Sequence, residues 1–311
     1  MSHKLNLGMY SFRIKISHQS DTEVMTIGEF LENAYSGEEQ PFVCFADDFL
    51  NHLRSLYKTK DRDLGGILLD SKLDAANRKL DIFIDGGITG IKQSLISSTE
   101  ERQEITPDDT VGLRFFIRFW MEQSNSGYIF IQSYSVLSIR KLIQEILYKT
   151  LKDRGFSIVQ KHIQKTTTRK RMKEFLEDSV PIAITLINKT SDFDPTRTKT
   201  SSARLELRGN LPSITDMTKD GIQQYARCRH GIILEEQNIY RYNVTYRTQN
   251  ERGDKEERTI PLETDLGDIK LIPNIVVPQE CIDKDNYPIF EEMQIFCDNE
   301  IKQILREIKE D

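Results

Sequence analysis

Several short segments of the chain alternate apolar and polar residues with a period of two, and this pattern restricts the fold more than any other feature. Residues 9–16 give one apolar and one polar side to an extended strand. Further strand-like runs lie at 64–69, 80–84, 111–120 and 128–134, with polar turns between neighbouring runs. The first half of the chain therefore predicts an antiparallel meander with helices beside it.

Between these strands, runs of apolar residues with helical spacing are bounded by residues that typically begin or end a helix. Thr26 and Glu29 match a capping box, in which each side chain bonds the backbone N–H at the other position. Ser138 precedes a run with an apolar face at every third or fourth residue, and Gly155 suits the exit of that helix. Pro288 suits the first position of a helix with a long apolar stripe.

Between the first strand and the meander, Phe42–Phe45 reads as a short buried strand, followed by a helix capped by Asp47 or Asp48. In the second half, strands are predicted at 181–187 and 204–208 and a helix at 214–229. Two further extended runs flank a polar turn at residues 250–254, which predicts a hairpin. The second half therefore also mixes helices with antiparallel strands.

A length of 311 residues exceeds what a single small core usually holds, so we expect two lobes. The predicted elements place an N-terminal α+β lobe at residues 1–154. A second α+β lobe at 155–311 begins with a basic segment and ends with the C-terminal helix. The expected fold class is α+β, with mostly antiparallel sheets flanked by helices.

Composition describes a well-solvated globular protein, with 38% hydrophobic and 30% charged residues. The four cysteines are far apart, which favours a reducing compartment over a disulfide framework. No stretch reaches the roughly 18 to 20 apolar residues that span a bilayer, and the N-terminus lacks the apolar core of a signal peptide. We therefore expect a cytoplasmic protein with no membrane partner.

Charge is distributed unevenly along the chain. Residues 149–173 contain nine Lys or Arg and one Asp, which gives +8. Because the whole chain carries −6, the remaining residues carry −14. This separation of charge along the sequence points to a partner of negative charge.

The basic segment is the candidate binding site. If a helix begins near Thr168, the cations of its first turns are repelled by the positive end of the helix dipole, unless they hold an anion. Phosphate groups of a nucleic acid are such anions. The alternatives are an acidic protein, a second copy of the chain, or a solvated face. The candidate nucleic-acid-binding residues are Lys161, Lys165, Arg169, Lys170, Arg171 and Lys173.

Motifs for catalysis are incomplete, which favours a non-enzymatic role without metal or cofactor. The glycine-rich run 86–94 lacks the Gly-Lys-Ser/Thr order of a phosphate-binding loop. Cys228 and His230 have the spacing of half a zinc site, without a second pair. Asp268 and Lys270 fit the short pattern of a metal-dependent nuclease, and this remains a further alternative.

The N-terminal strand Met9–Lys15 and the strand Tyr128–Tyr134, which runs into a long helix, resemble uncharacterised bacterial proteins of antiviral-defence loci. The resemblance covers the first lobe in outline and carries no catalytic motif. It implies a bacterial or phage context and a role within a multi-protein antiviral-defence or counter-defence system.

Overall fold

The computed structural model describes residues 5–90, 93–96, 102–106, 109–121, 125–134, 137–161, 163–168, 170–171, 174, 180–190, 201–208, 211, 219–231, 239–249, 255–261 and 274–310. The chain divides into two compact units. Unit 1 comprises residues 1–166 and 274–306, and unit 2 comprises residues 167–273 and 307–311. Residues 167–273 of unit 2 are therefore inserted in the sequence between the two parts of unit 1.

Unit 1 is built on an antiparallel sheet in the order β11-β1-β9-β8-β5-β4-β3. Its strands are β1 (Leu5–Phe12), β3 (Tyr57–Lys58), β4 (Leu64–Asp74), β5 (Lys79–Ile88), β8 (Val111–Trp120), β9 (Gly127–Tyr134) and β11 (Gln164–Lys165). The short β16 (Ile275–Val276) pairs with β1 near its start, and β11 pairs with β1 near its end. Segments from both ends of the unit 2 insertion thus lie against the first strand.

Two further strand pairs belong to unit 1. β2 (Ile14–Ile16) pairs with β10 (Phe156–Ile158), and β6 (Gln93–Ile96) pairs with β7 (Arg102–Ile105). The predicted meander is confirmed, because β4, β5, β8 and β9 are successive antiparallel neighbours in the main sheet.

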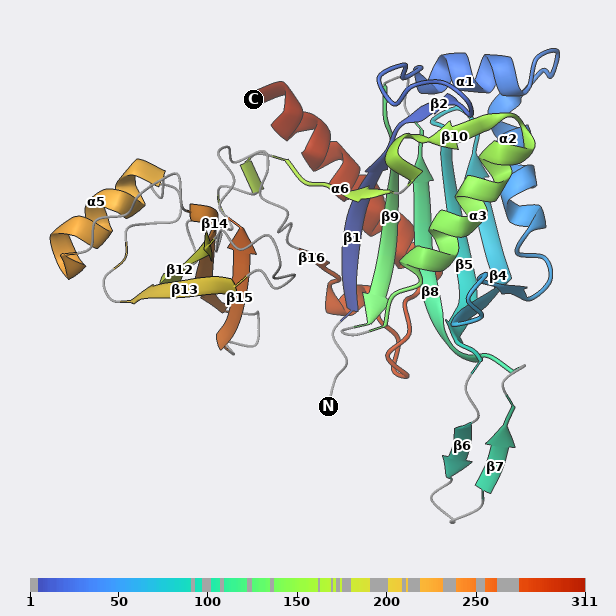
Figure 1. The fold of residues 1–311 in the computed structure, drawn as a ribbon. Helices are drawn as coiled ribbons and strands as arrows, with labels where there is room; N and C mark the ends of the chain where they lie inside the picture. Colours follow the sequence, from blue (N-terminus) through green and yellow to red (C-terminus); the bar gives the residue numbers. More distant parts are fainter. Residues whose placement is uncertain are drawn as a thin grey trace, which may run out of the picture. The chain divides into compact units, whose positions relative to one another are not determined.

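Helices cover both faces of the main sheet. α2 (Pro41–Asn51) and α3 (Arg140–Asp153) lie on one face, and α6 (Phe290–Glu310) lies on the other (Figure 1). The alternation along β8 explains this arrangement, since Phe119 packs against Phe49 of α2 and Phe116 packs against Phe290 of α6. The sheet is therefore the middle layer of three.

The predicted helix signals at Thr26 and Gly155 are confirmed in unit 1, whereas Pro288 pairs with Ile282 and lies two residues before α6 (Phe290–Glu310). α1 (Ile27–Ala34) begins after Thr26, whose hydroxyl accepts from the Glu29 N–H while the Glu29 carboxylate accepts from the Thr26 N–H. Gly155 follows α3 with a φ of 86°, a left-handed conformation that glycine adopts without strain. These contacts satisfy backbone groups that a helix end leaves unpaired.

The short strand expected at Phe42–Phe45 is wrong, because these residues belong to helix α2. Pro41 occupies the first position of that helix, where its missing N–H costs nothing. Phe42, Phe45 and Phe49 then share one buried face, so a run read as a continuous strand has helical spacing. Asp48 accordingly lies inside the helix and accepts a hydrogen bond from Tyr35, rather than capping the helix.

Unit 2 contains a second antiparallel sheet in the order β13-β12-β14-β15. Its strands are β12 (Val180–Thr190), β13 (Ser201–Arg208), β14 (Ile239–Gln249) and β15 (Lys255–Pro261). Helix α5 (Lys219–His230) confirms the helical part of the prediction for 214–229 that the structure describes, and it buries Ile222 and Ala226. The predicted hairpin tip at 250–254 lies outside the described residues, whereas β14 and β15 pair as expected.

The two units confirm an α+β protein with mostly antiparallel sheets. Their boundaries differ from the expected lobes at 1–154 and 155–311. Residues 155–166 join unit 1 because β10 and β11 pair with its strands, and α6 joins it up to Arg306 because its apolar face packs on the main sheet. None of the helices in the described ranges is long and apolar enough to cross a membrane.

Candidate functional site

The basic segment runs from unit 1 into unit 2. Lys161 ends the short 3-10 helix η1 (Val159–Lys161), and Lys165 lies in β11 opposite Tyr10. Both belong to unit 1, whereas Lys170 and Arg171 belong to unit 2. Lys170 is exposed and Arg171 is half-buried. Arg169 and Lys173 lie outside the described residues.

Thr168 has the capping role that the sequence predicted. Its hydroxyl oxygen accepts a hydrogen bond from the Arg171 N–H over 3.3 Å, which is the bond that an N-cap residue makes to the first turn. The same hydroxyl donates to the Glu307 carboxylate, and both side chains are buried. The start of the basic helical segment is therefore fixed to the end of α6 within unit 2.

Arg171 is already paired with a carboxylate of its own chain. Its Nε lies 3.2 Å from Glu307 Oε2, and only 4% of the Glu307 side chain is exposed. A buried carboxylate holds its partner strongly, because separating the pair leaves a charge without solvent. Arg171 is thus less suitable for contacting an external phosphate than the exposed Lys170.

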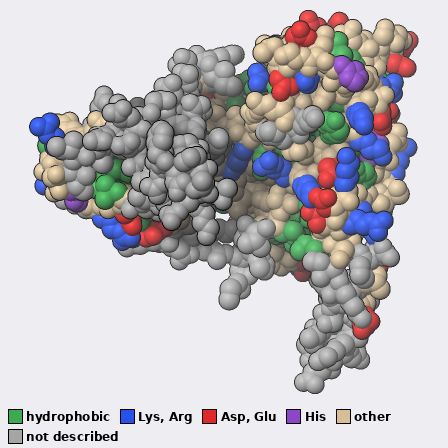
Figure 2. All heavy atoms as spheres, viewed as in Figure 1, with side chains coloured by type: hydrophobic (Ala, Val, Ile, Leu, Met, Phe, Trp, Pro, Cys, Tyr) green, Lys and Arg blue, Asp and Glu red, His purple; other side chains and the backbone are tan. Residues whose placement is uncertain are grey.

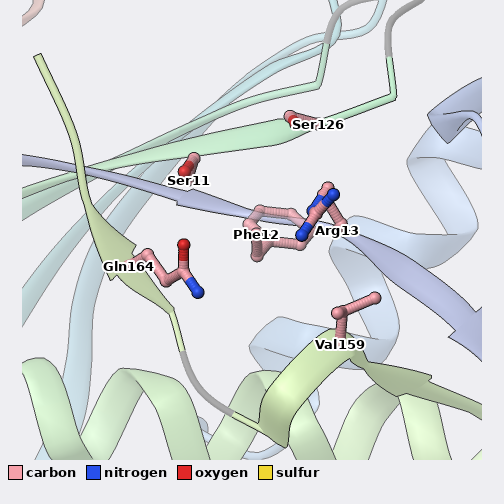
Figure 3. A pocket seen from close by; sticks show the side chains of 6 residues that line it. All are labelled: Ser11, Phe12, Arg13, Ser126, Val159 and Gln164. Atoms are coloured by element: carbon pink, nitrogen blue, oxygen red, sulfur yellow. The ribbon is translucent and has the colours of Figure 1, made fainter. Parts of the chain in front are cut away.

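A small pocket adjoins the basic segment in unit 1 (Figure 3). Figure 3 shows that Ser11, Phe12 and Arg13 come from the β1 region, whereas Gln164 comes from β11. Ser126 and Val159 complete the lining. The cavity volume is about 40 Å³, close to the ~30 Å³ that one water occupies in the liquid. The pocket is therefore large enough for water but too small for a substrate.

Exposed charges on the α3 side of unit 1 are largely compensated. Figure 2 shows basic and acidic side chains next to each other on this face. The Lys141 ammonium lies 2.7 Å from carboxylate oxygens of both Asp61 and Asp63, and Arg154 lies 2.7 Å from Asp48. This part of the α3 face is therefore a mixed surface rather than a basic track.

A buried ion cluster links β5, β8 and α6. Arg118 donates two hydrogen bonds to the Asp81 carboxylate, one of them 2.7 Å long from Nη2, and its Nη1 lies 2.7 Å from Asp298. Lys79 also binds Asp298, over 2.8 Å. Only 3% of the Arg118 side chain is exposed. Two acids and two bases thus compensate each other where α6 crosses the sheet.

Burial and charge perturb the protonation of this cluster. Burial raises the pKa of Asp81, against the opposing effect of Arg118. Burial works in the same direction on Asp298, but the Lys79 hydrogen bond and the Arg118 charge outweigh it and hold the pKa of Asp298 below its usual value. The adjacent Cys297 is fully buried, which raises the pKa of its thiol and keeps it protonated. The cluster holds α6 on the sheet, and nothing in its described surroundings makes it a reaction centre.

The candidates for a phosphate-binding loop, a zinc site and a metal-dependent nuclease gain no support from the described residues. Gly86 and Gly87 are paired within β5, so the predicted glycine-rich strand exit begins later, at Gly90 with a φ of 80°. Cys228 and His230 end helix α5 and are exposed. Asp268 and Lys270 lie outside the described residues. Within the described ranges, no three His, Cys, Asp or Glu side chains gather as a metal site requires.

The apolar pattern of the strands does not predict the ion cluster, although the sequence contains a signal for it. Arg118 interrupts the apolar strand 111–120, and Asp81 interrupts the apolar strand 80–84. Charged residues at strand positions that the pattern buries are seldom without a partner. The register that sets Asp81 opposite Arg118, and the distant Asp298, cannot be read from the pattern.

Comparison of the chain with protein-family models, with curated proteins and with solved structures finds no match. Function is therefore argued from the residues and their geometry.

Proposed function

We propose that the protein associates with nucleic acid without catalysing a reaction on it, as a component of a bacterial antiviral-defence or phage counter-defence system. The observation that carries the proposal is the +8 charge of residues 149–173 in a chain of net charge −6. A cluster of cations attracts the phosphate backbone of a nucleic acid. Binding then releases the counterions of the phosphates, which makes association favourable. The defence context rests on the resemblance of the N-terminal strand and the Tyr128–Tyr134 strand.

The exposure and the ion pairs of the candidate residues support some of them more than others as phosphate contacts. Lys170 supports the proposal because it is exposed on the first turn after Thr168. Arg171 contributes less, since Glu307 binds it. Lys161, Lys165, Arg169 and Lys173 complete the proposed phosphate-contacting set. These contacts read backbone charge rather than base identity, so binding is independent of sequence.

Fluorescence anisotropy with labelled single- and double-stranded DNA and RNA tests the proposal at low and physiological salt. Binding should weaken steeply with added salt, and each lost phosphate contact should reduce the slope of log K against log salt by about 0.9 for duplex DNA. The double variant Arg169→Glu with Lys170→Glu should lose at least about tenfold in affinity. The double variant Arg54→Glu with Lys284→Glu is the matched control, because it makes the same change of charge at an exposed arginine and an exposed lysine of unit 1 outside the segment.

No change in anisotropy with any of these nucleic acids at low salt ends the proposal. Equal losses in the Arg169→Glu with Lys170→Glu variant and in the Arg54→Glu with Lys284→Glu control would show that net charge, and not this segment, determines binding. The ratio of absorbance at 260 to 280 nm, in protein purified without high salt, is a second and independent measurement, because a binder carries nucleic acid through purification.

A protein-interaction subunit is the second candidate function. The ion pair between Arg171 and Glu307 favours this function, because in it a carboxylate binds a cation of the basic segment. An acidic protein or a second copy of the chain would then occupy the surface around Lys170. Light scattering of the wild type and the double variant distinguishes the two functions. A change in mass of the assembly, without nucleic-acid binding, would favour the interaction subunit.

A further inference from the structure

A larger pocket lies on the α6 side of unit 1, away from the basic segment in sequence. Its volume is about 500 Å³, within the roughly 300 to 1,000 Å³ of small-molecule sites. It lies among the turn between β4 and β5, the end of β8 and the second half of α6. Its lining includes Asn77, Arg78, Lys79, Trp120, Asp298 and Lys302.

Positive charge is in excess at this pocket. Lys79 and Asp298 belong to the buried cluster, in which the charges of Asp81, Asp298, Arg118 and Lys79 sum to zero. Arg78 and Lys302 remain, and neither forms an ion pair with any described residue. The pocket therefore presents two positive charges that the described part of the fold does not compensate.

Arg78 also has an unused hydrogen-bond donor. Its Nη1 is buried, and no acceptor among the described residues lies within hydrogen-bond distance. A buried donor without a partner costs free energy, and such groups call for an explanation. An anion that binds the rest of the guanidinium group from the pocket would stabilise the side chain that carries this donor.

The turn that carries Arg78 is fixed in advance. Asp74 accepts hydrogen bonds from both the backbone and the side-chain amide of Asn77. Arg78 follows with a φ of 48°, and its carbonyl accepts from the Met121 N–H. The guanidinium therefore projects from a constrained backbone, which lowers the entropy lost when a ligand binds.

The remaining wall of the pocket is apolar and includes an aromatic residue. Trp120 is buried at the end of β8 and stacks on Tyr128, with ring centroids 5.3 Å apart. Ile301 and Leu305 of α6 also line the pocket and add apolar surface. A ligand that fills this pocket needs an apolar or aromatic body as well as negative charge.

We propose that this pocket binds a small organic phosphate of the size of a mononucleotide. A phosphate monoester carries close to two negative charges at neutral pH, which matches Arg78 and Lys302, whereas a carboxylate supplies only one. The apolar body lies against the Trp120 side, and the Asn77 side-chain oxygen is the polar group of the lining that would accept from a polar edge. This site is independent of the proposed nucleic-acid surface.

Trp120 is the only tryptophan of the chain, so its fluorescence reports on this pocket directly. We expect AMP to cause a saturable change in that fluorescence. Adenosine, which lacks the phosphate, should bind at least about tenfold more weakly. Inorganic phosphate should compete with AMP. Equilibrium dialysis with AMP measures the same affinity without relying on the optical signal.

Matched variants assign the effect to the two cations. Arg78→Gln and Lys302→Gln should each weaken AMP binding about tenfold. Arg62→Gln is the control for the first, because Arg62 is also an arginine with positive φ, 53°, and does not line the pocket. Arg306→Gln is the control for the second, because Arg306 is an exposed cation of the same helix.

Absence of AMP binding by dialysis overturns the proposal, as does equal weakening in the variants and their controls. Binding of AMP and adenosine with equal affinity also overturns it, because the cations would then have no role. AMP binding retained in the Arg169→Glu with Lys170→Glu variant shows that the pocket and the nucleic-acid surface are separate. Loss of AMP binding in that variant would contradict their independence.

Discussion

Asp81 lies directly opposite Arg118 in the register of β5 and β8, and the guanidinium of Arg118 binds both oxygens of the Asp81 carboxylate. The pair faces α6, where Asp298 accepts a further hydrogen bond from the same guanidinium. This contact fixes the angle at which α6 crosses the sheet more specifically than apolar packing does, because charged hydrogen bonds require defined geometry.

Removing one member of this pair should destabilise unit 1 strongly. Arg118→Met leaves the buried Asp81 carboxylate without its counter-charge, and the expected loss is about 3 to 5 kcal/mol in the free energy of unfolding. Denaturant unfolding measures it. The double variant Arg118→Met with Asp81→Leu should recover much of the loss, because no buried charge remains. A single variant within about 1 kcal/mol of the wild type would contradict this account.

The lowered pKa of Asp298 predicts how the free energy of unfolding depends on pH. Its pKa in the folded protein lies below its ordinary value, so its stabilising effect is complete above the ordinary pKa of 3.8 and is lost as pH falls through the lower, folded value. Wild-type protein should therefore lose stability more steeply below about pH 4 than the Asp298→Asn variant. Melting temperatures of both proteins between neutral and acidic pH provide the test, and parallel curves would refute it.

Glu307 restrains Arg171, and its removal should strengthen nucleic-acid binding. Glu307→Gln takes away the negative charge that holds the guanidinium and leaves Arg171 able to contact a phosphate. The magnitude of the salt slope should rise by about 0.9 for duplex DNA. Glu174→Gln, an exposed acid of the same segment, is the matched control. Weaker binding in Glu307→Gln, with the fold intact by circular dichroism, would contradict the proposal.

The capping box of α1 should make a measurable contribution to stability. Thr26→Ala removes the acceptor for the Glu29 N–H, and the expected cost is about 1 kcal/mol. Thr22→Ala alters an exposed threonine in the preceding turn and should change the free energy of unfolding by less than about 0.5 kcal/mol. Denaturation of the two variants under the same conditions compares them, and equal effects would rule out a specific cap.

Local signals in the sequence predicted much of the fold. The capping residues Thr26 and Thr168, the left-handed Gly155 and the alternating strands of the main sheet depend on neighbours in sequence, and all are present. The segment at Phe42 failed because four consecutive apolar or small residues fit a buried strand as well as a buried helix. The spacing of Phe45 and Phe49, together with Pro41, distinguishes the two only when the longer segment is considered.

The candidate site was less predictable, because its contacts join residues far apart in sequence. Arg171 and Glu307 are separated by 136 residues, and no local pattern assigns one to the other. The same applies to the pocket, where Arg78 and Lys302 come from a turn and a distant helix. The sequence identified the basic segment by its composition, but only the structure shows which of its charges is already bound.

The discontinuity of unit 1 has a consequence for the order of events during synthesis. β16 and α6 emerge from the ribosome only after residues 167–273 of unit 2 have been made. Until then, the apolar face of the sheet around Phe83 and Phe116 has no helix to cover it. The nascent chain must therefore keep this surface from aggregating while a second unit is translated, and the rate of that translation sets how long the exposure lasts.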